Sequence, residues 1–282
     1  MSASASARAR FDELLARSDR DLPLAETALT FAREAYPALD VALYVAQLDV
    51  LAETLRRRLR PDITAADKIV ALNRYLFDEV GFKANAQNYY DPRNSYLNEV
   101  LDRRLGIPIT LSVVYLELGR RLGLALEGVS FPGHFLVKCP LKEGTVVLDP
   151  YQKGASLGVD DLQRRLRAAR GGGAGGKPPV KALLATATAR MIVVRMLRNL
   201  QGIHLEAKAW REALWVLDYL LVAEPARAEG YRERAAVYLE LECCRAALAD
   251  YEAYLTRATA AEDAAEVRAR IAELKRAAAR LN

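Results

Sequence analysis

The sequence of 282 residues is poor in the side chains that cross-link proteins or bind metals. It contains three cysteines, of which Cys243 and Cys244 are adjacent, and two histidines, His134 and His204. Three cysteines form no disulfide framework, and a disulfide between the adjacent Cys243 and Cys244 would strain the backbone. We therefore expect free thiols, which suit a protein of the reducing cytoplasm. Without spaced cysteine pairs, the sequence predicts neither a metal site nor a cofactor.

Long apolar runs are also missing. No segment approaches the roughly 18 consecutive apolar residues of a membrane-spanning helix. Residues 1–23 lack the apolar stretch of a secretory signal. We therefore expect a soluble, cytoplasmic protein without a membrane partner, in which residues 1–23 form a frayed N-terminal extension.

A large excess of one charge is absent as well. The 41 lysines and arginines against 36 aspartates and glutamates give a formal net charge of +5. Nucleic-acid binding would require the arginines at 56–60, 103–104, 120–121 and 164–170 to share one face. A surface on which both signs are mixed does not favour nucleic acid as a partner.

Helical periodicity, in contrast, is abundant. Over residues 24–80 apolar side chains recur three or four positions apart, which predicts consecutive amphipathic helices. Asp40 and Thr64 stand where side-chain oxygens would cap two of them. The same spacing over residues 97–122 predicts two further helices, joined by a tight turn that begins at Gly106.

Two short β-segments follow these helices. Residues 134–137 and 145–149 are β-branched or aromatic runs around a turn, which predicts an antiparallel hairpin. With the turn centred between Leu141 and Lys142, His134 lies opposite Asp149, at a Cβ separation of about 4.5–5.5 Å. A slip of one residue in the register would break this pairing.

An imidazole held by a carboxylate is the base-and-orienter half of a nucleophilic triad. The carboxylate fixes the tautomer of the ring and stabilises the imidazolium that forms when the base takes a proton. In a plainer interpretation, Asp149 and Pro150 start a turn and His134 is an ordinary strand residue. The residues alone leave both interpretations open.

The loop at residues 82–93 combines aromatic and amide side chains. Six residues in and after this loop are candidate binding contacts: Tyr89, Tyr90, Asp91, Arg93, Asn94 and Asn98. The alternative is a packed loop whose tyrosines cover the edge of the core.

The C-terminal third has a different organisation. Residues 171–179, GGGAGGKPP, predict a linker, which we place at 166–182. Beyond it, an offset of 34 residues aligns the segment from Trp210 with the segment from Cys244. This is the tetratricopeptide period, and small residues at equivalent positions would allow close helix packing. We expect a helical repeat domain at 183–282.

Four blocks of sequence carry a family resemblance. They are Asn94-Ser-Tyr-Leu-Asn-Glu-Val-Leu, Arg103-Arg-Leu-Gly-Ile-Pro-Ile-Thr-Leu-Ser, Phe131-Pro-Gly-His-Phe-Leu-Val and Leu148-Asp-Pro. In this order they resemble the bacterial SirB-like family, in which a transglutaminase-core domain precedes tetratricopeptide repeats. The resemblance implies a papain-related domain at 24–165, with a cysteine at the start of a helix and with His and Asp on adjacent strands. It assigns those last two positions to His134 and Asp149.

The cysteine of that family pattern has no counterpart in this sequence. The resemblance places it between Gly106 and Ser112, where Thr110 and Ser112 offer hydroxyls, which are weaker nucleophiles than a thiolate at neutral pH. Their alternative role is to satisfy backbone groups in the first helical turn. Cys139 follows His134 by five residues on the predicted strand, so the two side chains would point to opposite faces.

The predicted fold is therefore α+β and mainly helical: a papain/transglutaminase-like core with a small antiparallel sheet, followed by a tetratricopeptide-like helical domain. We expect a non-catalytic protein that lacks the nucleophile and acts as a protein- or peptide-binding or regulatory module. The alternative is a hydrolase or acyltransferase on an amide or ester bond, with His134 as base, Asp149 as orienter and a hydroxyl nucleophile. A hydroxyl or thiol within hydrogen-bonding reach of His134 would favour the enzyme.

Overall fold

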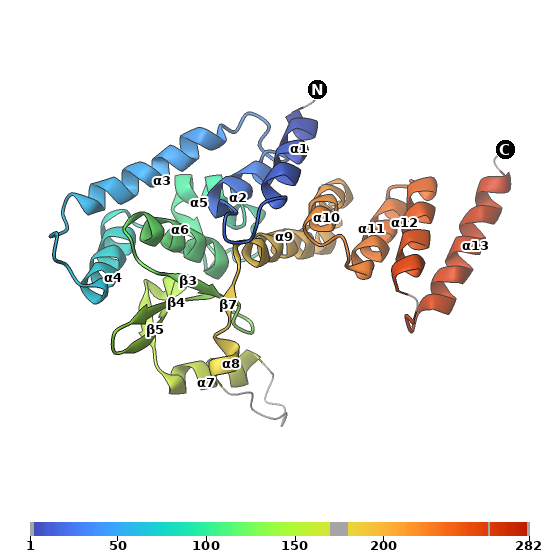
Figure 1. Ribbon diagram of the computed structural model, residues 1–282. Coiled ribbons are helices and arrows are strands. Elements are labelled where there is room, and N and C mark those ends of the chain that lie inside the picture. The colour runs from blue at the N-terminus through green and yellow to red at the C-terminus, as the bar shows by residue number, and fades with distance from the viewer. Residues whose placement is uncertain (1–2, 170–179, 259, 281–282) are drawn as a thin grey trace. The chain divides into compact units, whose positions relative to one another are not determined.

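The computed structural model describes residues 3–169, 180–258 and 260–280, and the chain divides into two compact units between Met196 and Leu197. Helices dominate both units, and the first unit also holds a small antiparallel sheet (Figure 1). The helices of the first unit are α1 (Ala3–Leu15), α2 (Leu24–Ala32), α3 (Val41–Arg56), α4 (Ala65–Asn73), α5 (Leu97–Arg103), α6 (Pro108–Arg121), α7 (Val159–Ala169) and α8 (Val180–Leu183), with a π-helical turn η1 (Arg74–Glu79) and 3-10 turns η2 (Pro92–Asn94) and η3 (Pro150–Gln152). Its strands are β1 (Lys83–Ala84), β2 (Leu105–Gly106), β3 (Glu127–Val129), β4 (Leu136–Leu141), β5 (Gly144–Asp149), β6 (Ala155–Leu157) and β7 (Thr186–Ala187).

The two predicted helix caps are present. A carboxylate oxygen of Asp40 accepts hydrogen bonds from the backbone N–H groups of Ala42 and Leu43, at 2.9 and 3.2 Å. The Thr64 hydroxyl accepts from the N–H of Asp67 at 3.1 Å. Each cap satisfies first-turn donors that the helix itself leaves unpaired, which is why α3 and α4 begin where they do.

The N-terminal residues depart from the expectation of a frayed extension. Helix α1 packs against α2, and the side chains of Ala7, Phe11 and Leu14 are fully buried. Arg10 adds an ion pair with Glu26 at 2.6 Å. The physical reason is the spacing of the three apolar residues, which places them on one face of a helix.

The larger sheet has the strand order β6-β5-β4-β3-β7, and every neighbouring pair is antiparallel. Strands β4 and β5 form the predicted hairpin, but Val137 lies opposite Leu148 and Leu141 opposite Gly144. The predicted register is therefore wrong by two positions, because the turn is a tight one at Lys142 and Glu143. Since the shift is even, each side chain keeps its predicted face of the sheet.

The two faces of this sheet are covered by different helices. On one face, Leu136 and Val147 share an apolar cluster with Leu162 and Leu166 of α7. On the other face, Leu148 lines a hollow together with residues of α4. Helix α6 contacts β3 and β4. Figure 1 shows α4 and α6 on one side of the sheet and α7 on the other.

The second unit repeats itself with the predicted period. Its helices are α9 (Ala189–Glu206), which crosses the division between the units, α10 (Trp210–Ala223), α11 (Ala228–Glu240), α12 (Cys244–Arg257) and α13 (Ala264–Arg280). A shift of 34 residues carries both ends of α10 onto those of α12. The turn residues Lys208 and Glu242, also 34 apart, both have left-handed backbones, with φ of 53° and 57°. Cys243 and Cys244 are free, exposed thiols.

The division between the units falls later than the predicted one at residue 183. Strand β7 joins the sheet by pairing with β3, with Ala187 opposite Gly128, so this segment belongs to the first unit. The GGGAGGKPP segment of the predicted linker, at 171–179, lies outside the described residues. Residue 170 lies outside the described residues as well, and the remaining parts of the predicted linker, 166–169 and 180–182, fall in α7 and α8.

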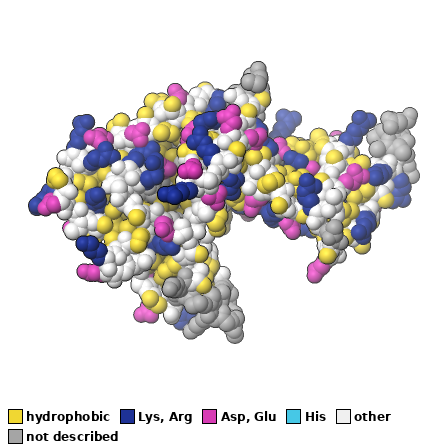
Figure 2. All heavy atoms as spheres, in the orientation of Figure 1, with side chains coloured by type: hydrophobic (Ala, Val, Ile, Leu, Met, Phe, Trp, Pro, Cys, Tyr) yellow, Lys and Arg dark blue, Asp and Glu magenta, His cyan; other side chains and the backbone are white. Residues whose placement is uncertain are grey.

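The surface carries charges of both signs. Figure 2 shows lysines and arginines interspersed with aspartates and glutamates over the visible face. Among the described helices, none combines the length and the apolar character that a bilayer crossing requires.

Candidate functional site

The predicted contact between the histidine and the aspartate is present at the start of the hairpin. The Nε2 atom of His134 lies 3.0 Å from Oδ1 of Asp149. His134 stands in the turn before β4 rather than on the strand, whereas Asp149 is the last residue of β5. The contact forms although the register differs, because the turn folds the imidazole back over the end of the strand.

Asp149 is fully buried and has partners from three segments of the chain. Besides His134, its Oδ1 accepts a hydrogen bond from the backbone N–H of Tyr151 at 3.0 Å. Its Oδ2 lies 2.7 Å from Nη2 of Arg165, on α7. Burial opposes ionisation, but the hydrogen bond from His134 and the charge of Arg165 outweigh it and hold the pKa of Asp149 below its ordinary value.

The turn that carries His134 is held by a cation from α9. Nη2 of Arg195 donates to the backbone carbonyl of His134 at 2.8 Å and lies 3.5 Å from that of Phe131. Gly133, with φ of 68°, adopts the left-handed backbone that this turn requires. Burial lowers the pKa of Arg195, and its guanidinium packs over the ring of Phe135. The position of the imidazole therefore depends on α9 as well as on the hairpin.

One tyrosine ring packs against the imidazole of His134, and two further tyrosines form a ring pair of their own. The ring of Tyr151 meets that of His134 edge to face, with centroids 5.8 Å apart, and Tyr89 meets Tyr90 in the same way at 5.2 Å. Burial is the main cause that raises the pKa of Tyr89, and the neighbouring Tyr151 phenol adds to it. The side chain of Tyr90 is 71% exposed. We call Tyr89, Tyr90 and Tyr151 the tyrosine patch.

The two hydroxyls considered as nucleophiles are engaged elsewhere. The Thr110 hydroxyl donates to the backbone carbonyl of Asn94 at 2.8 Å and accepts from the N–H of Ile107 at 3.1 Å. The Ser112 hydroxyl donates to the carbonyl of Pro108 at 2.7 Å. Both side chains are fully buried. They complete the backbone hydrogen bonding at the start of α6, as the plainer interpretation expects.

Cys139 is a buried residue of β4. Its side chain lies on the sheet face opposite to that of Leu136 and Lys138, because side chains alternate along β4. It is 1% exposed, and burial raises the pKa of its thiol. A buried thiol with a raised pKa is not the thiolate that attacks acyl groups.

The loop before α5 is organised by Asn94. This side chain accepts a hydrogen bond from Asn85 at 3.0 Å and donates to the carbonyls of Asn88 and Tyr89 at 2.7 and 3.2 Å. Its own carbonyl receives the Thr110 hydroxyl. Two residues predicted for different roles, a binding contact and a nucleophile, are therefore partners of each other in a packed loop.

The other predicted contacts divide between buried and exposed positions. Asp91 caps η2 and pairs with Arg93 at 2.8 Å, so these two side chains satisfy each other. Asn94 and Asn98 are 0 and 3% exposed, which argues against direct contact with a partner. Tyr90 and Arg93 present most of their side chains to solvent, and Arg93 is already paired with Asp91.

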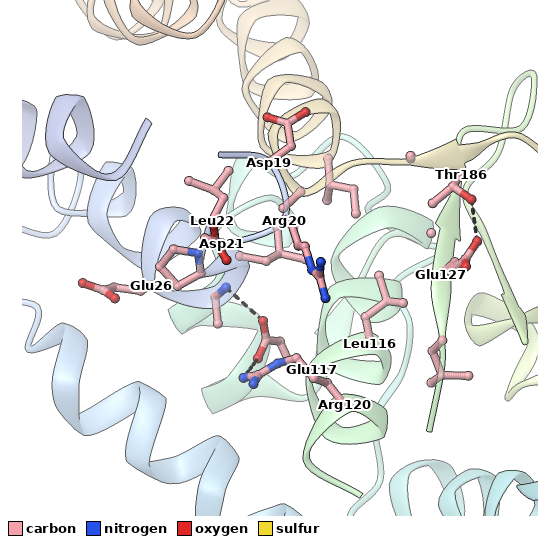
Figure 3. A pocket seen from close by; sticks show the side chains of 18 of the residues that line it. Asp19, Arg20, Asp21, Leu22, Glu26, Leu116, Glu117, Arg120, Glu127 and Thr186 are labelled. Carbon is pink, nitrogen blue, oxygen red and sulfur yellow. Dashed lines mark hydrogen bonds and ion pairs between the residues drawn. The ribbon is translucent and has the colours of Figure 1, made fainter. Parts of the chain in front are cut away.

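A cavity of about 640 Å³ lies elsewhere in the first unit, between the segment 19–26, α6 and the β3–β7 edge (Figure 3). Glu117, 5% exposed, accepts from the backbone N–H of Ala25 at 3.2 Å and pairs with Arg120 at 3.1 Å. Glu127, the first residue of β3, pairs with Lys138 at 3.1 Å. These carboxylates are used within the fold, and the described residues contain no cluster of three or more groups placed to hold a metal ion.

Comparison with known proteins identifies the class. A model of the transglutaminase-like superfamily matches residues 42–198, and a tetratricopeptide-repeat model matches residues 200–272. The chain belongs to the transglutaminase-like superfamily, and tetratricopeptide repeats follow that domain.

Individual relatives make the assignment more specific. A UPF0162 protein of Xylella fastidiosa (strain Temecula1) is 42% identical over 245 residues, 87% of each chain. A UPF0162 protein of Pseudomonas aeruginosa is 33% identical over 230 residues, 81% of this chain and 82% of the relative. F-box only protein 21 of Homo sapiens is 31% identical over 185 residues, 61% of this chain but 28% of the relative. The finer resemblance to SirB-like proteins stays a prediction.

Proposed function

We propose that this protein is a transglutaminase-like protein without a catalytic nucleophile, and that it acts as a protein- or peptide-binding or regulatory module of the cytoplasm. The observation that carries the proposal is the burial and hydrogen bonding of the Thr110 and Ser112 hydroxyls. Both hydroxyls are fully buried and donate to backbone carbonyls, at 2.8 and 2.7 Å. Acyl transfer requires a nucleophile whose proton the base can take, and these protons point to carbonyl oxygens instead.

The electrostatics of the dyad support the same proposal. In a triad, the carboxylate stabilises the imidazolium that forms during the reaction. Asp149 already shares its charge with Arg165 at 2.7 Å, on the face of the sheet that α7 covers. Thr110 and Ser112 belong to α6, which packs on the opposite side. The carboxylate of the dyad is therefore engaged with α7, whereas the two hydroxyls belong to α6.

The intact contact between His134 and Asp149 favours a second candidate, the hydrolase or acyltransferase. With Nε2 bound to the carboxylate, Nδ1 of His134 is the ring atom that would take the proton of a nucleophile. For this function a hydroxyl from α6 would have to leave its carbonyl partner and reach the ring.

An amine-incorporation assay separates the two candidates. The purified full chain is incubated with a fluorescent primary amine and a glutamine-bearing protein, next to the His134→Ala variant. We expect equal, background incorporation from both proteins, and equal hydrolysis of a fluorogenic ester. Turnover by the wild-type chain that His134→Ala abolishes would overturn the proposal in favour of the enzyme.

Partner capture then tests the binding role. The tagged full chain is used to retain proteins from a bacterial cytoplasmic extract, in parallel with Tyr90→Ala and His134→Ala. Leu43→Ala, at a residue of α3 that is 65% exposed, serves as the control for loss of an exposed apolar side chain. Loss of a specific partner in the first two variants alone assigns binding to the tyrosine patch. Retention by all variants assigns it to the repeats, and the absence of any specific partner contradicts a binding role.

A further inference from the structure

The repeat unit contains a groove between its helices. It has a volume of about 710 Å³ and is lined by the end of α9, the start of α10, and residues of α11, α12 and α13. This volume falls within the range of roughly 300–1,000 Å³ of ligand sites in proteins. The groove lies wholly within the unit that begins at Leu197.

The apolar part of the groove is partly aromatic. Trp210 contributes a half-buried ring, whereas Tyr251, Val237 and Val267, which are 8, 1 and 5% exposed, form the floor of the groove. Ala236 is exposed and small, which leaves the middle of α11 open to an approaching chain. Such a surface suits the alkyl stem of a long side chain, whose charged end then has to be satisfied at the edge.

The charges around the groove are mainly negative. Five carboxylates and two arginines line it, a formal charge of −3 in a chain whose net charge is +5: Glu233, Glu240, Asp263, Glu266, Glu273, Arg232 and Arg270. The groove therefore has the sign opposite to that of the whole molecule. Such a local potential attracts cations and repels anions.

Most of these carboxylates already have cationic partners. Asp263 pairs with Arg232, and Glu273 with Arg270 at 3.0 Å. Glu233 pairs with Arg227 at 2.9 Å, outside the groove.

Two carboxylates remain available. Glu240 and Glu266 are exposed, and neither has an ion pair with another part of the chain that the structure describes. Glu240 is the last residue of α11, and Glu266 lies in the first turn of α13. A ligand that meets both must carry positive charge.

We propose that this groove binds an extended segment of a partner protein that carries lysine or arginine side chains next to apolar ones. The apolar side chains and the alkyl stems pack on Trp210 and Ala236, and the cationic ends pair with Glu240 and Glu266. A cation near the indole of Trp210 gains further attraction from the face of the ring. The inference rests on the proposed function, and it specifies the class of partner that the repeats select.

The test is a titration of the full chain with two synthetic nine-residue peptides, each labelled with a fluorophore and followed by anisotropy. One peptide carries two lysines and two leucines among serines, and the other carries glutamates in place of the lysines. We expect the cationic peptide to bind, the acidic one to show no binding, and added salt to weaken the complex. In a Trp215→Phe background, the emission of Trp210 should change on binding, which locates the peptide in the groove.

Variants with matched charge complete the experiment. Glu240→Gln combined with Glu266→Gln should weaken binding of the cationic peptide about tenfold, as the loss of two surface ion pairs would. Glu242→Gln combined with Glu262→Gln changes the net charge equally at exposed positions that do not line the groove, and should leave the affinity within about twofold. Equal affinity of both double variants, or tighter binding of the acidic peptide, would overturn the inference.

The outcome is separable from that of the proposed function. If the chain retains a partner from extract but ignores the cationic peptide, the choice of ligand is wrong and the binding role stands. Acyl transfer that depends on His134 would refute the proposed function and leave the peptide titration unaffected.

Discussion

The ion pair between Arg165 and Asp149 makes a strong prediction about stability. Arg165→Met keeps the length of the side chain and removes its charge, so Asp149 keeps only His134 and the N–H of Tyr151 as partners. Breaking a buried ion pair from one side costs about 3–5 kcal/mol. Because the Arg165 side chain is 23% exposed, we expect a smaller loss, about 2–3 kcal/mol, in the free energy of unfolding.

The sign of the pH dependence follows from the lowered pKa of Asp149 in the folded chain. A carboxyl with a depressed folded-state pKa stabilises the fold above its unfolded-state pKa of about 3.9, and this contribution is lost as the pH falls through the folded-state value. The difference in stability between wild type and Arg165→Met should therefore be complete at pH 7. It should narrow as the pH falls below about 4, because Asp149 then becomes protonated and Arg165 loses its anionic partner.

Calorimetry and urea unfolding followed by circular dichroism measure this difference. A loss of this size corresponds to a fall of roughly 4–12 °C in the melting temperature of a unit of about 200 residues. Arg164→Met is the matched control, since its side chain is 72% exposed and its pair with Asp161 lies on the surface. If both variants unfold alike at pH 7, the assignment of Arg165 as the partner of Asp149 is refuted.

Three further predictions test other parts of the molecule. Arg195→Met should remove the hydrogen bonds to the turn at 131–134 and lower the free energy of unfolding by about 1–2 kcal/mol. Amide hydrogen exchange in that turn should become faster, and unchanged exchange would contradict the role of Arg195. Arg234→Met removes the ion-pair partner of Asp250, which is 8% exposed and lies 2.7 Å from Arg234. We expect the free energy of unfolding to fall by about 3 kcal/mol. Tryptophan emission reports this unfolding because both tryptophans belong to the repeat unit. An unshifted emission transition would show that the pair contributes little. Asp40→Ala should cost about 1 kcal/mol through loss of the α3 cap, whereas Asp40→Asn should retain most of it.

The parts of the fold that depend on local chemistry were predictable from the sequence. Asp40 and Thr64 mark the starts of α3 and α4 because a capping oxygen acts on residues two or three positions away. The period of 34 residues is visible because each repeat meets its neighbour through equivalent small and apolar positions. The same local pattern accounts for α1, because Ala7, Phe11 and Leu14 are spaced to form one apolar helix face.

The parts that depend on distant contacts were not predictable in this way. The hairpin register depends on a two-residue turn, and the alternation of apolar residues is compatible with any even shift. Arg195 acts on backbone carbonyls of the His134 turn, and such acceptors leave no signature in the sequence. Arg165 offered a weak signal, since it lies between Leu162 and Leu166 on the helix face that packs against the sheet.

The geometry around Asp149 also explains how a histidine–aspartate contact can exist without catalysis. This one carboxylate connects the end of β5 with the turn before β4, with η3 and with α7, through His134, Tyr151 and Arg165. Because a buried carboxylate without partners is costly, each of these donors contributes to the fold whether or not a nucleophile is present. A structural requirement alone is therefore sufficient to maintain the dyad. For this reason the hydroxyls of α6, and not the contact between His134 and Asp149, decide whether the site can transfer an acyl group.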